Sequence, residues 1–468
     1  MIFDLAIIGG GSAGLSIAAA AAQFGERVVL FEKGEMGGDC LNSGCVPSKS
    51  LIAAAKYAHA QRTSAPFGIA PVEPVVDYAK VMDHVSSVIA KIAPHDSVER
   101  FEGLGVHVVK AHAKFISTQT LEADGKTYQA RKIVIATGSR AAIPPIPGLK
   151  DVAFLTNETL FKNRVLPKHL IIIGGGPIGM EMAQAHRRLG CDVTVLEAAK
   201  VLSKDDPDLA KIVIDSLVEE GVSIRESTAI TNVKMNRSNF QVFLASGEMI
   251  EGSHLLVAAG RAPNIEGLNL EAAGIASTKR GITVDKGLRT TNRNVYAAGD
   301  IAGGLQFTHV AGYHAGLIIR NALFKLPVKN RTDIIPWVTY TDPELAHVGM
   351  SDAEAHRVLG KSAKTLTWHF AENDRAQTMS KAKGMIKVMI GRGGVIVGTS
   401  IVGPSAGELI APFVLAVTNK INISAFANLV LPYPTLSEIG KRAAITNYAG
   451  IAQKPWLRKM LGLLKIFG

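Results

Sequence analysis

The sequence predicts an α/β protein with two Rossmann-like domains and a smaller α+β domain at the C-terminal end. The chain has 468 residues, more than one hydrophobic core organises, because domains hold about 100 to 200 residues each. A unit of strand, glycine-rich loop, helix and second strand recurs 165 residues further along the chain. Near the C-terminus, residues 383–390 and 393–403 have the composition of strands, and residues 406–417 that of a helix.

The composition is that of a compact globular protein. Hydrophobic residues make up 47% of the chain and charged residues 19%, with 46 glycines and 20 prolines, which argues against a disordered chain. The formal net charge of +11 is compatible with nucleic acid or an acidic membrane as partner, and equally with a site for phosphate-bearing ligands. We expect the phosphate-bearing ligands and no nucleic acid.

The first copy of the repeated unit lies at the N-terminal end. Residues 3–8 are expected to form a buried parallel strand, residues 9–14 (GGGSAG) form the loop, and a small-residue helix follows. The second strand, residues 27–32, ends at Glu32, which lies 23 residues after the first glycine.

The second copy has the same internal spacing. Residues 169–173 form its first strand, residues 174–179 (GGGPIG) its loop and residues 192–197 its second strand, which ends at Glu197. Glu197 again lies 23 residues after the first glycine. A single glycine-rich loop is a weak indicator, but two copies with matched strand, helix and acid offsets predict two bound dinucleotides.

The glycine positions follow from the geometry of a phosphate-binding turn. The first glycine permits the tight turn, the second lets the backbone approach a pyrophosphate, and the third lets helix and strand pack closely. The N–H groups at the helix N-terminus then bind the phosphates, and the acid binds the ribose hydroxyls. These glycines are Gly9, Gly11 and Gly14 in the first copy and Gly174, Gly176 and Gly179 in the second.

Two of the three cysteines are close in sequence. Three cysteines are too few for a disulfide-stapled secreted scaffold, so Cys40 and Cys45 are expected to carry chemistry. Four residues separate them, a spacing that allows a reversible disulfide across one helical turn. A zinc site is disfavoured, because Cys191 is remote and no second Cys or His pair has ligand spacing. No metal ligands are expected.

Residues 37–49 (GGDCLNSGCVPSK) resemble the redox-active disulfide segment of the class I pyridine nucleotide-disulfide oxidoreductases, which include dihydrolipoamide dehydrogenase, glutathione reductase and mercuric reductase. Further motifs of that family follow in the same order, at residues 136–140, 259–264 and 298–300. The resemblance therefore covers nearly the whole chain. It implies FAD and a nicotinamide dinucleotide as cofactors, and a relay of hydride from NADH through FAD to the cysteine pair and on to an acceptor.

The resemblance also implies roles for single residues. Cys45 would face the flavin as a thiolate and Cys40 would meet the substrate. Lys49 would lie near the flavin and pair with Glu181, which stabilises charge that develops as hydride arrives. The expected cofactor contacts are Gly9, Gly11, Ser12, Ala13, Gly14, Glu32, Lys33, Gly38, Asp39, Lys49, Thr137, Gly138, Gly174, Gly176, Gly179, Glu197, Gly260, Arg261, Gly299 and Asp300.

The nucleotide preference is predicted from the end of the second unit. Glu197 is followed by Ala198 and Ala199, where an enzyme that binds a 2′-phosphate would have arginine. NADH is therefore favoured over NADPH. The alternative is that Lys200 or the Arg187-Arg188 pair reaches a 2′-phosphate.

The acceptor is less well defined, because the chain departs from the family near the C-terminus. Residues 431–438 (LPYPTLSE) keep the proline, threonine and Glu438 of the family's acid/base motif but have Tyr433 in place of histidine. Tyrosine has an ordinary pKa of about 10, so it is a poor proton shuttle at neutral pH. Tyrosine here is similar to mercuric reductase, as are residues 300–309 and 373–376, yet no C-terminal cysteine pair is present.

Three functions therefore remain open. The first is reduction of a disulfide or small-molecule acceptor, as in dihydrolipoamide dehydrogenase. The second is reduction of a metal ion, as in mercuric reductase. The third, of another class, is a non-enzymatic FAD-binding redox sensor or adaptor at a membrane.

Two smaller departures concern single positions. Asp39 stands where threonine is usual, and its carboxylate should raise the pKa of the Cys40 thiol or attract a cationic acceptor. Pro177 stands where many relatives have a tyrosine over the nicotinamide site. Neutral drift is the favoured explanation for both.

The motifs divide the chain into domains. Residues 1–150 and 281–335 are expected to form a discontinuous FAD domain, with two helices inserted between residues 50 and 100. Residues 151–280 form the NAD(P) domain, and residues 336–468 a dimerisation domain. The resemblance implies a homodimer, in which Tyr433 and Glu438 from a second copy complete the site.

The tail, residues 454–468, is basic and amphipathic. Residues 439–468 contain six basic and no acidic residues. An apolar face opposes Arg458 and Lys465, as in helices that lie on anionic membranes. Packing of this face on the partner subunit is the other interpretation and is slightly favoured. That face consists of Trp456, Met460, Leu463, Leu464 and Phe467.

The expected location is the cytoplasm. The apolar stretch 5–22 lacks a basic region before it and contains the phosphate-binding glycines, so it is not interpreted as an export signal. A peripheral location at the inner face of the membrane would follow if the tail binds lipid.

Overall fold

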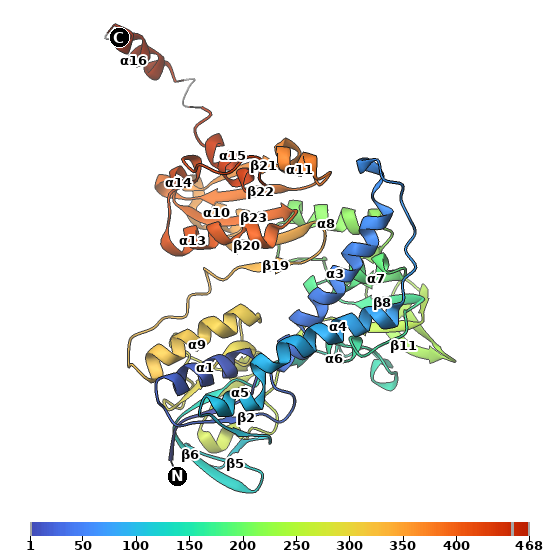
Figure 1. Ribbon diagram of the computed structural model, residues 1–468, viewed down its shortest axis with the longest axis vertical. Coiled ribbons are helices and arrows are strands. Elements are labelled where there is room, and N and C mark those ends of the chain that lie inside the picture. Colours follow the sequence, from blue (N-terminus) through green and yellow to red (C-terminus); the bar gives the residue numbers. More distant parts are fainter. Residues whose placement is uncertain (1, 451–453, 467–468) are drawn as a thin grey trace. The chain divides into compact units, whose positions relative to one another are not determined.

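The computed structural model describes residues 2–450 and 454–466, which divide into two compact units (Figure 1). The first unit comprises residues 2–64, 70–198 and 225–332. The second comprises residues 65–69, 199–224 and the described residues from 333 onward. The boundaries expected near residues 150, 280 and 335 stay predictions. No helix among the residues that the structure describes has the length and apolar composition needed to cross a membrane.

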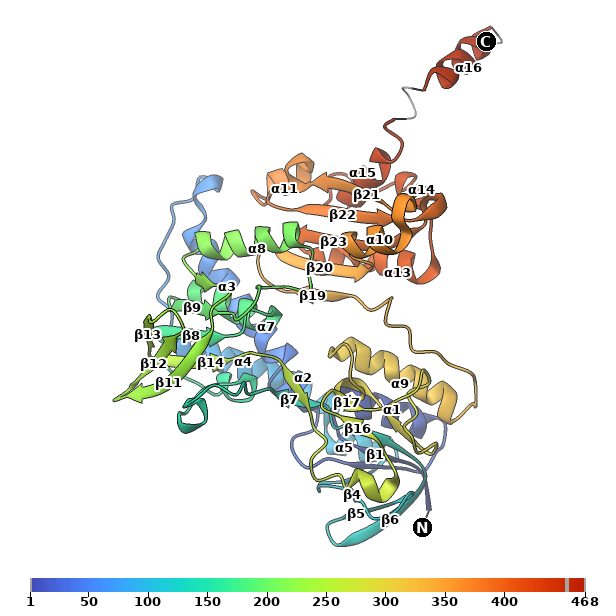
Figure 2. The same ribbon diagram turned by 180° about the vertical axis from the view of Figure 1, so that it is seen from behind.

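A seven-stranded sheet organises one part of the first unit (Figure 2). Its strand order is β3-β2-β1-β6-β5-β4, with β18 also paired to β6. The pairs of β1 with β2 and with β6 are parallel, so the loop after β1 and the residue after β2 lie at the same edge of the sheet. The strands are β1 (Ile2–Ile8), β2 (Val28–Phe31), β3 (His107–Val109), β4 (Lys114–Phe115), β5 (Thr120–Ala123), β6 (Lys126–Ile135) and β18 (Val295–Ala297).

β1 is buried on both faces of this sheet. Leu5 and Ile7 belong to one core cluster, while Ala6 and Ile8 belong to another, as the alternation of side chains along a strand requires. The first cluster includes side chains of α1 (Ser12–Gln23) and α9 (Thr308–Ala322), which pack against each other. α9 therefore lies in the same layer as α1, the helix that follows the first glycine loop.

The second copy of the unit has the same local construction. The parallel strands β9 (Asp192–Leu196), β8 (His169–Ile173) and β14 (His254–Val257) pair in that order, and α7 (Pro177–Arg188) follows β8. An antiparallel sheet is formed by β11 (Ile230–Asn236), β12 (Asn239–Leu244) and β13 (Met249–Gly252). Two short pairs complete the first unit: β7 (Ser139–Ala141) with β15 (Arg261–Pro263), and β16 (Ser277–Thr278) with β17 (Gly281–Ile282).

The segment expected to contain two helices forms α3 (Cys45–Arg62) and α4 (Tyr78–Ile92), which pack on each other. α3 also packs on α7, so the cysteine segment is in contact with the second copy of the unit. Shorter helices in this unit are α2 (Gly38–Asn42), α5 (Val98–Gly103) and α6 (Asn157–Leu160).

The second unit is built on a five-stranded antiparallel sheet in the order β19-β20-β23-β22-β21, whose strands are β19 (Trp337–Thr339), β20 (Glu344–Gly349), β21 (Lys364–His369), β22 (Met385–Ile390) and β23 (Ile396–Gly403). The two expected strands are thus β22 and β23. The helix expected over residues 406–417 is instead two helices, α12 (Ala406–Leu409) and α13 (Ala411–Asn419). Pro412 in the first turn of α13 has no N–H to continue the preceding helix.

The remaining elements of the second unit surround this sheet or follow it. The segment from residue 199 joins it, because Lys387 of β22 binds Asp206 (2.9 Å) and Asp208 (2.6 Å) at the start of α8. The other helices are α8 (Pro207–Glu219), α10 (Asp352–Leu359), α11 (Asp374–Thr378), α14 (Ile423–Ala427), α15 (Glu438–Thr446) and α16 (Pro455–Leu464). The short strand β10 (Ser223–Arg225) follows α8 and is the edge strand of the sheet in the order β10-β9-β8-β14.

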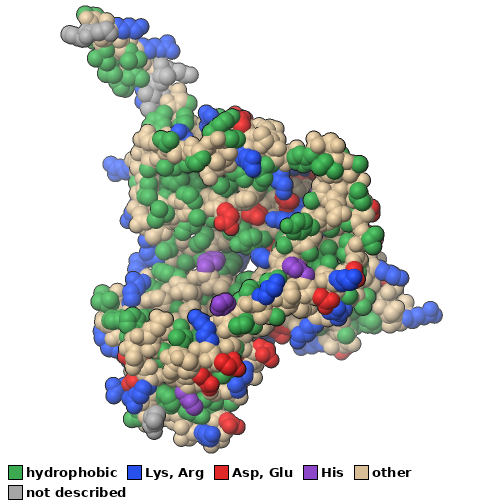
Figure 3. All heavy atoms as spheres, in the orientation of Figure 1, with side chains coloured by type: hydrophobic (Ala, Val, Ile, Leu, Met, Phe, Trp, Pro, Cys, Tyr) green, Lys and Arg blue, Asp and Glu red, His purple; other side chains and the backbone are tan. Residues whose placement is uncertain are grey.

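α16 has no buried residue, and its apolar and basic side chains are at the surface (Figure 3). Trp456 is 58% exposed and Leu463 62% exposed. Residue Phe467, which the sequence analysis assigns to the apolar face, lies outside the described residues.

Candidate functional site

The first glycine-rich loop turns directly from β1 into α1. Gly9 has a φ of +112°, and a Cβ added at Gly14 would lie 1.9 Å from the Gly9 carbonyl oxygen. Only glycine allows this approach of helix and strand. No side chain among the described residues caps α1 at Gly11, so its first N–H groups are available to a phosphate group.

The second loop repeats this geometry. Gly174 has a φ of +115°, and a Cβ at Gly179 would lie 2.0 Å from the Gly174 carbonyl oxygen. α7 likewise has no side-chain cap at Gly176 among the described residues. The two loops are therefore closely similar cradles at the N-termini of α1 and α7, as two dinucleotides would require.

Each loop is adjacent to its predicted acid. The Glu32 carboxylate accepts hydrogen bonds from the Gly10 N–H and the Gly34 N–H, both at 2.6 Å. Glu197 accepts from the Gly175 N–H at 2.7 Å. Each carboxylate thus lies beside its loop, where a ribose next to a bound pyrophosphate would be. Of the other expected contacts, Ser12 opens α1, Ala13 is buried and Lys33 is exposed.

The two cysteines lie on consecutive short elements rather than on one helical turn. Cys40 is in α2 and Cys45 is the first residue of α3. The helix breaks at Ser43 and Gly44, where a Cβ on Gly44 would lie 2.9 Å from the Asp39 carbonyl oxygen. At Gly38 the segment approaches the first glycine loop, since an added Cβ would lie 2.7 Å from the Gly11 Cα. The cysteine turn therefore packs on the phosphate cradle.

Cys40 and Cys45 are free thiols that hydrogen bond to each other. The hydrogen bond from Cys40, that from Thr308 and the positive charge of Lys49 lower the pKa of Cys45 to about 6, against the opposing effect of burial. The pKa of Cys40 is raised, by its hydrogen bond to Cys45 and by burial. At neutral pH the pair therefore holds one thiolate, on Cys45, and one thiol, on Cys40.

Thr308, from a distant part of the chain, contacts Cys45. Its Oγ1 lies 3.3 Å from the Cys45 Sγ, and it is the first residue of α9. A helix N-terminus carries a partial positive charge, which also favours the thiolate.

The structure brings Lys49 and Glu181 together. The Lys49 Nζ donates to the Glu181 Oε2 at 2.8 Å, and the Glu181 side chain is 5% exposed. α3 and α7 pack on each other, which places a charged pair between the cysteine helix and the second glycine loop. Its role toward a flavin stays a prediction.

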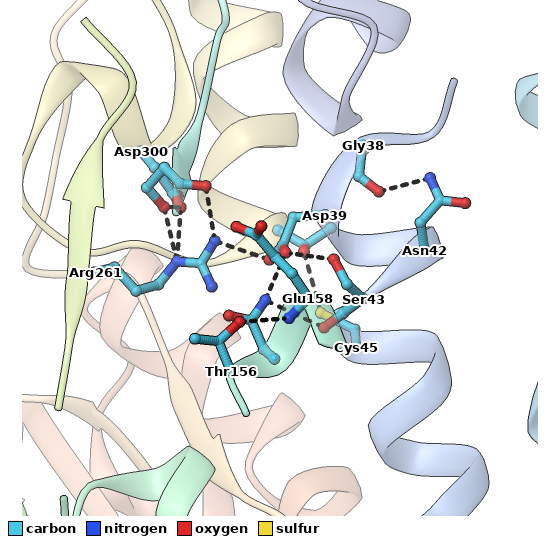
Figure 4. Close-up of polar contacts among 12 residues, drawn as sticks. Gly38, Asp39, Asn42, Ser43, Cys45, Thr156, Glu158, Arg261 and Asp300 are labelled. Atoms are coloured by element: carbon cyan, nitrogen blue, oxygen red, sulfur yellow. Dashed lines mark hydrogen bonds and ion pairs between the residues drawn. The ribbon is translucent and has the colours of Figure 1, made fainter. Parts of the chain in front are cut away.

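A hydrogen-bonded network connects the other family motifs to the cysteine turn (Figure 4). Arg261 in β15 donates to the Asp39 Oδ2 (2.8 Å) and to the Ser139 Oγ (2.7 Å), and its Nε lies 3.5 Å from the Asp300 Oδ2. Ser139 donates to Asp300 at 2.5 Å. Burial raises the pKa of the Asp300 carboxyl group, which Ser139 and Arg261 counteract.

The motifs at residues 136–140 and 259–264 are also joined. The Thr137 hydroxyl donates to the Asn264 carbonyl at 2.8 Å, and the Asn264 amide donates back to the Thr137 carbonyl at 2.9 Å. The adjacent glycines have left-handed φ values, of +66° at Gly138, +118° at Gly260 and +71° at Gly299. These turns bring the expected cofactor residues to the ends of β6, β14 and β18.

Tyr433 and Glu438 belong to the second unit. The Tyr433 side chain is 70% exposed, and its hydroxyl donates to the Asp374 Oδ2 at 2.8 Å. This hydrogen bond and the negative charge of Asp374 raise the pKa of Tyr433, so it stays protonated. Glu438 begins α15 and adds to this effect. The approach of either residue to Cys40 stays a prediction.

Four residues that contact the site were not assigned to it from the sequence. Ser139 lies within the motif at residues 136–140, and Thr308 lies within the stretch 300–309 that resembles mercuric reductase. Both could therefore have been predicted from the sequence as residues of the site. Ser43 and Asn157 bind Asp39, yet no motif marks Asn157. Among the described residues, no group of three or more His, Cys, Asp or Glu side chains could hold a metal ion.

Comparison with known families gives two matches. Residues 3–315 match the family described as pyridine nucleotide-disulphide oxidoreductase. Residues 335–444 match the pyridine nucleotide-disulphide oxidoreductase dimerisation domain. Together they cover most of both structural units.

Individual relatives agree with this result. A mercuric reductase of Lysinibacillus sphaericus is 33% identical over 95% of this chain and 82% of its own length. A dihydrolipoyl dehydrogenase of Bacillus subtilis (strain 168) is 32% identical over 95% of this chain and 98% of its own. Among solved structures, LpdA from Mycobacterium tuberculosis has a TM-score of 0.88 at 28% identity, covering 96% of this chain and 100% of that chain.

A further solved structure is a Cu(II) complex of the HOCl-induced flavoprotein disulfide reductase RclA from Escherichia coli. It has a TM-score of 0.85 at 28% identity, and the match covers 94% of this chain and 99% of that chain. The fold is therefore shared over nearly the whole length of both proteins.

Proposed function

Because the chain belongs to the pyridine nucleotide-disulphide oxidoreductase family, an FAD-dependent enzyme family that uses a pyridine nucleotide, we propose that it passes electrons in pairs from NADH to a small acceptor through Cys40 and Cys45. The observation that carries the proposal is that the two neighbouring thiols have opposite pKa shifts: the pKa of Cys45 is lowered to about 6 and the pKa of Cys40 is raised. The enzyme assignment displaces the non-enzymatic adaptor hypothesis. The dimerisation domain supports a homodimer.

FAD, when bound, supplies the two-electron chemistry between the nicotinamide and the thiol pair. The glycine loop at the start of α1 and Glu32 would hold its pyrophosphate and ribose, and Asp300 and Gly299 would hold its middle part. Lys49 would place a positive charge, balanced by Glu181, near the ring.

The thiol step is a two-stage exchange. The Cys40 sulfur attacks one sulfur of an acceptor disulfide and releases the first thiol. The Cys45 thiolate then attacks the Cys40 sulfur and releases the second, so the pair loses two electrons as a disulfide and the acceptor gains two as thiols. Cys40 first passes its proton to the Cys45 thiolate through the hydrogen bond between them. Cys45 then gives that proton to the first leaving sulfur, which restores the Cys45 thiolate for the second attack, and the second sulfur leaves as a thiolate that takes its proton from water.

Tyr433 favours a second candidate, reduction of a metal ion. A residue whose pKa is raised above that of ordinary tyrosine cannot accept a proton at neutral pH, so it cannot replace the family histidine as a base. Thiolates bind soft metal ions directly and need no proton for a leaving thiolate. The similarity to mercuric reductases and to a protein solved with Cu(II) supports including both metals among the acceptors.

The experiment is an acceptor screen with wild type and Tyr433→His, using lipoamide, glutathione disulfide, mercuric and cupric ions and a quinone. Histidine restores a base that titrates near neutrality, so turnover of the disulfide acceptors is expected to rise about tenfold or more. Ferricyanide, which needs no thiol, serves as the control and should be reduced at the wild-type rate. An equal disulfide rate in both proteins contradicts the proposed limit at Tyr433.

We propose NADH as the preferred donor, and the same screen is run with NADPH. Of the three positive charges considered from the sequence, Arg187 donates to Asp192 at 2.8 Å and Arg188 is 5% exposed, while Lys200 is exposed. Glu197 would bind the ribose hydroxyls and would repel a phosphate in their place. Comparable kcat/KM values for the two nucleotides would contradict this preference.

We further propose that α16 binds an anionic membrane surface. Its apolar side chains, which include Trp456, Met460 and Leu464, occupy one arc of the helix, and Lys454, Arg458 and Lys465 occupy the opposite arc. All six of these side chains are exposed. Such a helix gains from apolar insertion and from attraction to acidic lipid headgroups.

Removal of residues 454–468 is expected to lower binding to phosphatidylglycerol-containing vesicles about tenfold or more, measured by co-sedimentation. Vesicles of phosphatidylcholine alone, and full-length protein with Arg458→Gln and Lys465→Gln, serve as matched controls for charge. Unchanged sedimentation of the truncated protein contradicts membrane binding. Conversion of dimers to monomers on truncation would instead assign the helix to the partner subunit.

A further inference from the structure

Asp39, the residue before Cys40, has three partners in the first unit (Figure 4). Its carboxylate accepts from the Arg261 Nη2, the Ser43 hydroxyl and the Asn157 amide, each at 2.8 Å. The side chain is 33% exposed, so the carboxylate is partly shielded from water. Ser43 lies in the break between α2 and α3, which places the carboxylate beside the turn that joins the two cysteines.

Arg261 connects this carboxylate to a second one. Its side chain is 14% exposed and is held between Asp39 and Asp300. It also donates to the hydroxyl and to the carbonyl oxygen of Ser139, at 2.7 and 3.1 Å. One guanidinium therefore serves two carboxylates beside the thiol pair.

We propose that Asp39 is a positioning residue for the redox thiols: its salt bridge with Arg261 ties the cysteine turn to the Asp300 end of the site and sets the charge that both thiols experience. The inference rests on the proposed function of the pair. It concerns a position where the family usually has threonine, and no threonine could form this ion pair.

The electrostatic consequence has a definite sign. The charged groups acting on the thiols are Lys49 from α3, which lowers the pKa of Cys45, and Asp39 from α2, which raises the pKa of both Cys40 and Cys45. Asp39 itself faces Arg261 from β15, and Arg261 faces Asp300 from the segment after β18. Asp39 thus disfavours a thiolate on either cysteine, and Arg261 moderates that effect.

The test uses the FAD-loaded protein with its thiols reduced by a phosphine. Rates of iodoacetamide alkylation are measured separately for Cys40 and Cys45 by mass spectrometry between pH 5 and 9. Asn keeps the size of Asp39 and one acceptor oxygen but removes the charge, so Asp39→Asn is expected to speed alkylation of Cys40 about three- to tenfold. Arg261→Gln, which leaves the carboxylate without its cation, should slow alkylation of both thiols.

Glu158→Gln is the matched control, because Glu158 is an exposed carboxylate next to Asn157 that does not bind Arg261 in the network of Figure 4. Its rates should equal those of wild type. Asp39→Thr, which restores the residue usual in the family, should move the rates in the same direction as Asp39→Asn. Wild-type rates in both Asp39 variants, or an equal change in Glu158→Gln, would overturn the inference.

A second readout separates this inference from the proposed function. The two-electron-reduced wild-type protein should have a long-wavelength absorbance band that arises from contact of the Cys45 thiolate with the flavin. This band should disappear on acidification. Because Asp39 raises the pKa of Cys45, the midpoint of that loss should lie at lower pH in Asp39→Asn than in wild type. Absence of the band in wild type would refute the proposed function. A wild-type band with an unshifted midpoint in the variant would refute the role of Asp39 alone.

Discussion

Cys45→Ser is expected to abolish the long-wavelength absorbance of the two-electron-reduced enzyme and to lower turnover of every thiol-dependent acceptor by about 10³-fold or more. Serine has nearly the same size but its hydroxyl does not ionise near neutral pH, so the anion beside the flavin is lost. Anaerobic titration with NADH measures the band, and steady-state assays measure the turnover. A normal band in the variant would refute the assignment of Cys45 as the flavin-side thiolate.

Two other cysteine variants serve as controls. Cys191→Ser should have no effect on the band, because Cys191 is fully buried and burial raises the pKa of its thiol to about 12. Cys40→Ser should keep the band while turnover falls, because the thiolate remains but its partner in the disulfide is gone. Loss of the band in Cys40→Ser and its retention in Cys45→Ser would reverse the two roles.

The pH dependence of the band follows from the same thiolate. Because the Cys45 pKa is depressed to about 6, the band should be present at neutral pH and should disappear as the pH falls through about 6. The hydrogen bond from Cys40 is the largest cause of that depression, so in Cys40→Ala, which has no donor at this position, the midpoint should shift to higher pH. A midpoint that does not move would show that Thr308, Lys49 and the flavin suffice to hold the thiolate.

The second large effect is expected at the Lys49–Glu181 pair. Lys49→Met should slow reduction of the bound flavin by NADH about 10²- to 10³-fold, because a preorganised positive charge near the developing anion is lost. Glu181→Gln should slow it by a similar factor, since Lys49 loses a buried partner 2.8 Å away. Single-turnover stopped-flow absorbance measures this step without a thiol acceptor.

The double variant discriminates between a pair and two independent residues. If Lys49 and Glu181 act as one unit, the double variant should be about as slow as either single variant. Lys91→Met, at an exposed lysine of α4, serves as the matched control and should retain the wild-type rate. Wild-type flavin reduction in Lys49→Met would remove the pair from the hydride step.

The outline of the fold and most residues of the candidate site could be predicted, because the sequence patterns that indicate them are local. The two glycine loops, the acids after them and the cysteine spacing each lie within a few tens of residues. Where a local pattern was extended too far, the structure differs. The cysteines were expected on one helical turn, but α2 ends at Asn42 and α3 begins at Cys45, so Ser43 and Gly44 separate the two helices. The helix expected over residues 406–417 breaks before Pro412.

The sequence by itself determined the two glycine-rich turns, the spacing of the cysteine pair and the resemblance to the family, because the steric rules for glycine turns act over short stretches of chain. The tertiary structure alone decided which groups control the thiols. Thr308 meets Cys45 across 263 residues, and Arg261 meets Asp39 across 222. Tyr433 was placed in the site by its motif, but only the folded second unit pairs it with Asp374. Such partners come together through sheet and helix packing, which a local pattern does not specify.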